Sequence, residues 1–114
     1  MVTDSILQTI KTMLGGITEE CETFDDQLLL FINTAFSILH QYGVGPEEGV
    51  EITKNTTWSE VISEARLNMV KTYVFIKVKL LFDPPTSSFV IAALQEQLKE
   101  VDWRIREEIS CYGQ

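Results

Sequence analysis

The tandem proline in Asp83-Pro84-Pro85 constrains the fold most strongly, because it separates two long stretches of helical periodicity. Proline fixes φ and lacks a backbone N–H, so an α-helix cannot continue through this pair. The residue before a proline is displaced toward extended geometry, so the preceding helix should end near Leu81 or Phe82. The hydroxyls of residues 86–88 can then cap a new helix. The sequence therefore predicts a rigid corner between two long helices.

The segment before the corner predicts one continuous helix from Thr57 to about Leu81. Thr57 and Glu60 have the spacing of a capping box, in which the two residues satisfy each other's backbone N–H groups. A helix of about 24 residues would be about 36 Å long. Its apolar residues cover more than half of its circumference, which fits either a central helix or one that also meets a second subunit. They are Trp58, Val61, Ile62, Ala65, Met69, Val70, Tyr73, Val74, Ile76, Leu80 and Leu81.

The segment after the corner predicts a helix with a narrow apolar seam. Its apolar residues alternate spacings of three and four, close to the 3.5-residue period of a coiled coil. They are Ile91, Leu94, Leu98, Val101, Ile105 and Ile109. Trp103 lies outside this seam and beside arginines, a composition favoured at interface hot spots. Packing of Trp103 against the first helix is the equal alternative.

Two further helices are predicted in the first half of the chain. An amphipathic helix with Thr3 as its cap should end at Gly15-Gly16, because tandem glycines are costly inside a helix. A second helix should run from about Phe24 to Tyr42, with Gly43 as the left-handed residue that ends it.

Two features near this second helix have competing interpretations. The acidic stretch 19–26 fits a capping box from Thr23 to Asp26, or an acidic patch for a partner. His40 is the only histidine, and near a helix C-terminus it is expected to be a surface group that compensates the dipole rather than a catalyst or metal ligand.

The stretch between residues 43 and 57 is the least regular part of the chain. Residues 50–53 alternate apolar and polar side chains as a short strand would, yet no partner strand is evident elsewhere. This segment is therefore either an extended loop or a strand that pairs with a neighbouring subunit. Glu47, Glu48 and Glu51 make the loop acidic.

These elements predict an all-α fold in a single domain that spans residues 1–114. The expected architecture is a small bundle of about four helices, with a Pro-Pro corner between two long C-terminal helices and one irregular loop over residues 43–57. A hydrophobic fraction of 45% fits such a folded bundle.

The net charge of −8 limits the partners that the surface can bind. Residues 1–57 carry a charge of about −7 and residues 58–114 about −1. Phosphate neutralisation by basic side chains supplies most non-specific affinity for nucleic acid, so a DNA-binding role is disfavoured. The same acidity suits a surface past which DNA slides.

The chain shows no pattern that indicates catalysis. It has no Gly-rich phosphate loop, no nucleophile–histidine set and no metal-ligand spacing, so we expect no enzyme activity, cofactor or metal. Cys21 and Cys111 are expected to be reduced cysteines of a cytosolic protein. No secretory signal is expected, and the apolar run 69–82 is too short to span a bilayer.

Three stretches carry a resemblance to a known family. The corner reads Lys-Val-Lys-Leu-Leu-Phe-Asp-Pro-Pro-Thr-Ser-Ser over residues 77–88, and the last helix contains Glu-Val-Asp-Trp-Arg-Ile over residues 100–105. The pattern of residues 26–35, followed by Tyr-Gly-Val at 42–44 and Thr-Trp at 57–58, agrees as well. The chain resembles the head–tail connector (adaptor, or head-completion) proteins of long-tailed double-stranded DNA phages that infect Gram-positive hosts.

The resemblance implies a structural protein of the virion neck, assembled in the cytoplasm of the bacterial host. Such a protein would form a ring under the portal protein, a dodecamer in the virion, and would extend the DNA channel. It would also offer a platform for the next neck or tail-completion protein, while double-stranded DNA passes without specific binding. The sequence ends at Gln114, soon after the last helix, so a long C-terminal tail that docks into the portal is not expected.

Within this interpretation, two groups of residues are the candidate sites. The expected interface residues are Lys77, Lys79, Phe82, Trp103, Arg104 and Arg106. The expected channel-lining residues are Glu47, Glu48 and Glu51.

Two other functions remain as alternatives. The chain could be a monomeric, acidic, helical adaptor or regulator that binds a host or phage protein. A DNA-binding helix-turn-helix module is disfavoured by the acidity and by a Pro-Pro corner where a short Gly-containing turn is usual.

Overall fold

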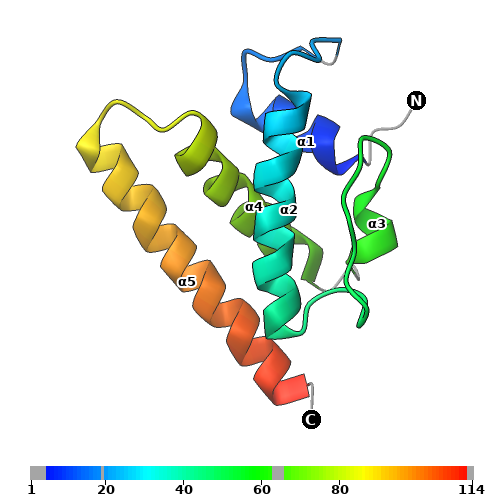
Figure 1. Cartoon of the computed structure of the whole chain (residues 1–114). Helices are drawn as coiled ribbons and strands as arrows, with labels where there is room; N and C mark the ends of the chain where they lie inside the picture. The colour runs from blue at the N-terminus through cyan, green and yellow to red at the C-terminus, as the bar shows by residue number, and fades with distance from the viewer. Residues whose placement is uncertain (1–4, 19, 63–65, 113–114) are drawn as a thin grey trace.

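The described residues form a bundle of five helices, which confirms the predicted all-α class. The computed structural model describes residues 5–18, 20–62 and 66–112, and for residues 109–112 it describes the backbone alone. The helices are α1 (Ile6–Leu14), α2 (Asp25–Tyr42), α3 (Trp58–Val61), α4 (Leu67–Phe82) and α5 (Ser88–Tyr112) (Figure 1). No strand occurs among these residues, apart from an isolated antiparallel bridge between Ser5 and Thr57.

The core lies where α1, α2 and α4 meet. Apolar residues at helical spacing point inward from each helix, and α2 packs along α4 while α4 packs along α5. The inward residues include Ile6 and Ile10 of α1, Leu28, Ile32 and Leu39 of α2, and Val70, Val74 and Val78 of α4. Trp58 of α3 is fully buried beside α1, where its indole N–H donates to the Thr9 hydroxyl at 3.0 Å.

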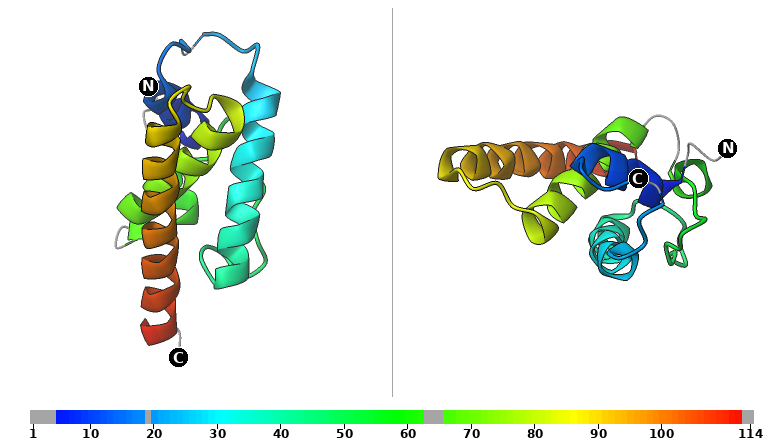
Figure 2. Two further views of the ribbon diagram at one scale, coloured as in Figure 1. Left: turned by 90° about the vertical axis from the view of Figure 1, so that its left-hand side faces the viewer. Right: turned by 90° about the horizontal axis from the view of Figure 1, so that it is seen from above.

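The predicted corner is present and joins α4 to α5. The Asp83 N–H still donates to the Lys79 carbonyl, and the helix then ends because the next two residues are prolines. The Ser87 hydroxyl accepts the Val90 N–H at 3.3 Å and so caps α5. Among the α5 side chains that the structure describes, Val101 and Ile105 are buried. The half of α5 that follows the corner extends beyond the rest of the bundle (Figure 2).

The prediction of one continuous helix from Thr57 to Leu81 was wrong. Ile62 has extended backbone angles, φ −125° and ψ 133°, so α3 ends at Val61 and α4 begins at Leu67. The break places Trp58 against Thr9 of α1 and Phe36 of α2. Val61 lies near Gly45, while α4 packs along α2 and α5. The wide apolar arc is therefore divided between two separate helices.

The predicted helix ends had mixed outcomes. The capping box that opens α3 is confirmed, with the Thr57 N–H donating to Glu60 Oε1 at 2.7 Å. Gly43 is confirmed as the left-handed residue after α2, with φ 100°. The capping box from Thr23 to Asp26 was wrong, because α2 begins at Asp25 without a side-chain cap.

The start of the chain also differs from the prediction in one detail. Ser5 caps α1 by accepting the Gln8 N–H, whereas Thr3 lies outside the described residues. The side chain of Ile109, predicted to belong to the α5 seam, lies outside them as well.

Within the part of the chain that the structure covers, no helix has the length and apolar character needed to cross a bilayer.

Candidate functional site

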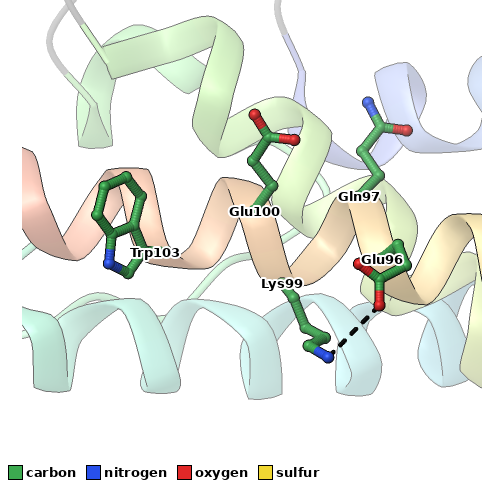
Figure 3. A pocket seen from close by; sticks show the side chains of 5 residues that line it. All are labelled: Glu96, Gln97, Lys99, Glu100 and Trp103. Carbon is green, nitrogen blue, oxygen red and sulfur yellow. Dashed lines mark hydrogen bonds and ion pairs between the residues drawn. The ribbon is translucent and has the colours of Figure 1, made fainter.

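The outward side of α5 carries a shallow depression around Trp103. Residues three, four and seven apart share one side of a helix, so Glu96, Glu100 and Trp103 lie together. With Gln97 and Lys99 they border a space of about 570 Å³ (Figure 3). Trp103 is 53% exposed, which makes it an interface candidate and removes the alternative that it packs into the first helix. We call these five residues the α5 outer face.

A group of exposed apolar residues lies at the corner between α4 and α5, and it was not identified from the sequence. Leu81 at the end of α4 and Phe89 and Val90 at the start of α5 are 54%, 83% and 42% exposed. Exposed large side chains at the tip of one hairpin form the kind of patch that partners cover. The signal was available, since Phe89 lies off the apolar seam of α5, as Trp103 does.

The other predicted interface residues already have contacts within the chain. Phe82 is half-buried, with its ring edge-on to Phe24 at 5.3 Å between centroids. Lys79, which is half-buried, pairs with the exposed Asp83 at 3.2 Å, and the exposed Arg104 pairs with Glu100 at 3.0 Å. Such pairs contribute little to stability, so Lys79 and Arg104 stay available to a partner. Phe82 also connects the corner to the start of α2.

Lys77 and Arg106 lie at a groove between three helices. The groove encloses about 300 Å³ and is lined by Ile38 and Tyr42 of α2, Tyr73 and Lys77 of α4, and Leu98, Lys99 and Asp102 of α5. The Lys77 ammonium lies 5.8 Å from the centre of the Tyr73 ring, and the Arg106 guanidinium 5.6 Å from that of Tyr42. We call this the three-helix groove.

The net charge of the three-helix groove is set by Lys77. Asp102 accepts a hydrogen bond from Arg106 Nε at 3.0 Å, so its carboxylate is already matched by a cation. Burial, together with a hydrogen bond to Asp102, raises the pKa of Tyr42 above its usual value, and burial likewise raises that of Tyr73. Both phenols are therefore neutral. Lys99 pairs with Glu96 at 3.5 Å, so Lys77 gives the groove its net positive charge.

The acidic loop is held in a fixed shape by contacts with α2. The Gly49 N–H donates to the Pro46 carbonyl at 3.0 Å, which places Glu47 and Glu48 at the tip of a turn. The His40 ring nitrogen Nε2 lies 2.8 Å from the Glu47 carbonyl oxygen, so this lone histidine anchors the turn. Gly49 has φ +86°, and a Cβ there would lie 3.7 Å from that imidazole.

The extended part of the loop is anchored by one asparagine. The Ile52 N–H donates to Asn33 Oδ1 at 2.8 Å, and Asn33 Nδ2 donates to the Ile52 carbonyl at 3.0 Å. The Thr53 N–H donates to the Thr56 hydroxyl at 2.9 Å. The alternation over residues 50–53 thus reflects an extended part of the loop that packs on α2. The backbone N–H groups of Ile52 and Thr53 form their hydrogen bonds within the chain.

The acidic loop and the α5 outer face lie on opposite sides of the molecule. In Figure 1 α2 separates α5 from the loop that precedes α3, and the view from above in Figure 2 agrees. Glu47, Glu48 and Glu51 are exposed, and no ion pair is found for them within the described residues. The acidic loop and the α5 outer face are therefore two separate surfaces of the chain.

The described residues hold no group of three or more His, Cys, Asp or Glu side chains that could bind a metal ion. Their buried titratable pair is Lys11 and Asp25, whose charged atoms are 2.9 Å apart. The Lys11 ammonium also donates to the Cys21 carbonyl at 2.6 Å. These bonds tie α1 to the start of α2, so the pair has a structural role.

Comparison with known proteins agrees with the resemblance in the corner and the last helix. No curated protein and no solved structure matches the chain. A family model described as phage connector protein matches residues 6–109, which includes all of α1 to α4 and most of α5. The chain therefore belongs to the phage connector protein family.

Proposed function

We propose that this protein forms a ring under the portal of the phage capsid, extends the DNA channel and joins the capsid to the tail. The observation that carries the proposal is the family match over residues 6–109. Its partners would be the portal protein, further copies of itself and the next neck or tail-completion protein. The ring would be a dodecamer in the virion neck, after assembly in the host cytoplasm.

The distribution of exposed residues supports a ring. A closed ring of identical subunits needs two different, complementary surfaces on each subunit. The α5 outer face and the apolar corner provide one candidate surface, with Trp103 and Phe89 as exposed aromatic residues. Aromatic side chains of this kind contribute most to binding when a partner covers them. Lys77, Lys79, Arg104 and Arg106 lie on α4 and α5, the two helices that carry this surface, and would orient the subunits.

The charge supports a channel through which DNA moves freely. Glu47, Glu48 and Glu51 are the candidates for the channel wall, and the tip of the turn makes Glu47 and Glu48 the leading pair. Their carboxylates would repel phosphates and prevent adhesion of the duplex, consistent with the net charge of −8. No enzymatic step is required for this role.

Light scattering of the purified chain with and without purified portal tests the proposal. We expect portal to gain a mass that corresponds to one copy of this chain per portal subunit, and electron microscopy to show an added ring. A chain that stays monomeric and leaves the mass of the portal unchanged would contradict the proposal. That result would favour the monomeric adaptor or regulator.

A further inference from the structure

We propose that successive copies are joined by an arm and a socket. The arm is Val50 with Glu51 of the acidic loop, and the socket is the three-helix groove of the next copy. This inference rests on the proposed ring and adds the contact that closes it. Glu47 and Glu48, at the tip of the turn, would then remain at the channel.

The socket has an apolar interior and a positive rim. Ile38, Leu98 and the neutral phenol of Tyr42 are partly exposed and offer an apolar surface to an entering side chain. Among the described residues, Lys77 contacts the ring of Tyr73, and Lys99 forms an exposed ion pair with Glu96 at 3.5 Å. Both ammonium groups can therefore meet a carboxylate from outside, since an exposed pair is easily exchanged.

The arm has the complementary character. Val50 is 39% exposed and lies between Glu48 and Glu51, so it offers one apolar side chain flanked by carboxylates. The Asn33 bonds to Ile52 fix the backbone beside it, which lowers the conformational entropy lost on binding. The Ile52 and Thr53 amides are already bonded within the chain, so we expect the contact to be made by the side chains of Val50 and Glu51.

The positions of the two surfaces suit a head-to-tail ring. The arm and α5 lie on opposite sides of α2, so one copy cannot fill its own socket (Figures 1 and 2). Lys99 borders both the socket and the α5 outer face, and in Figure 3 it points toward the α2 side. An arm seated in the socket would therefore adjoin Trp103, and the two surfaces would form one continuous interface.

Disulfide trapping in full-length chain assembled on portal tests the contact. The background is Cys21→Ser with Cys111→Ser, and the test variant adds Val50→Cys and Lys77→Cys. Mild oxidation should link successive subunits into a ladder of dimers, trimers and higher species on a non-reducing gel. Each single-cysteine variant should stay monomeric, because a head-to-tail contact never brings two identical residues together. The matched control pairs Val50→Cys with Thr34→Cys, an exposed site on α2, and should give no ladder.

The outcomes separate this inference from the proposed ring. Rings without a ladder would overturn the arm and socket while leaving the ring intact. Dimers from Val50→Cys alone would show symmetric arm pairing and would also overturn it. If the native chain assembles while the cysteine-free background does not, the contact is tested by exchanging charges in the native chain. There Lys77→Glu should reduce assembly about fivefold and added Glu51→Lys should restore it; absence of rescue would overturn the contact. Failure of the native chain to assemble would contradict both proposals.

Discussion

Replacing Asp25 with alanine is expected to lower the free energy of unfolding by about 3–5 kcal/mol. The Asp25 side chain is only 5% exposed and Lys11 is 1% exposed, so the substitution removes the carboxylate that lies 2.9 Å from a buried ammonium group. Lys54 also lies 4.0 Å from Asp25, but its side chain is half exposed, so the pair with Lys11 is the buried one. Urea denaturation followed by circular dichroism measures the change.

Asp26→Ala is the matched control, because Asp26 is exposed in the same first turn of α2. It should cost about 1 kcal/mol or less, through the helix dipole alone. The double variant Lys11→Met with Asp25→Leu should recover part of the loss, since it removes both charges from the core. Equal losses for Asp25→Ala and Asp26→Ala would show that the buried pair does not hold α1 to α2.

Replacing Trp103 with alanine is expected to weaken ring assembly by about 2 kcal/mol or more per contact, roughly thirtyfold. Trp103 is half exposed in the single chain, so its loss should change the free energy of unfolding by only about 0.5 kcal/mol. Titration of portal with the variant, beside urea denaturation of the chain alone, separates the two effects.

Leu30→Ala serves as the control for Trp103, because Leu30 is a large apolar residue that is 63% exposed on α2. It should assemble as the native chain does. If Trp103→Ala assembled equally well, the α5 outer face would not be part of the interface. Aggregation of the variant is not expected, because the substitution removes exposed apolar surface.

The elements that the sequence predicted correctly are those fixed by local chemistry. Pro84-Pro85 ends α4 because proline lacks an N–H, and Gly43 ends α2 because glycine readily adopts positive φ. The Thr57–Glu60 capping box likewise depends on residues three apart. No distant contact was needed for any of these predictions.

The features that the sequence did not reveal depend on distant contacts. The Asn33 bonds to Ile52 join residues 19 apart, and the Lys11–Asp25 pair joins residues 14 apart. The extended backbone at Ile62 was hidden because isoleucine fits the apolar pattern of a helix and of a strand equally well.

Among the candidate sites, too, local patterns were predicted from the sequence and distant contacts were not. Trp103 was recognised because it lies off the apolar seam of its helix, and the structure leaves it exposed. Phe82 stays a predicted interface residue, and its ring contact with Phe24 was not predicted because it arises only when α2 and α4 pack together. The three-helix groove could not be predicted, because its lining residues come from α2, α4 and α5.

Electron-microscopic reconstruction of the neck of the phage particle tests the central claim most directly. We predict a ring of this chain between the portal and the next neck component, with α5 of each copy against its neighbour and Glu47 and Glu48 at the channel. A neck in which the portal contacts the next component directly, without this chain between them, would contradict the claim.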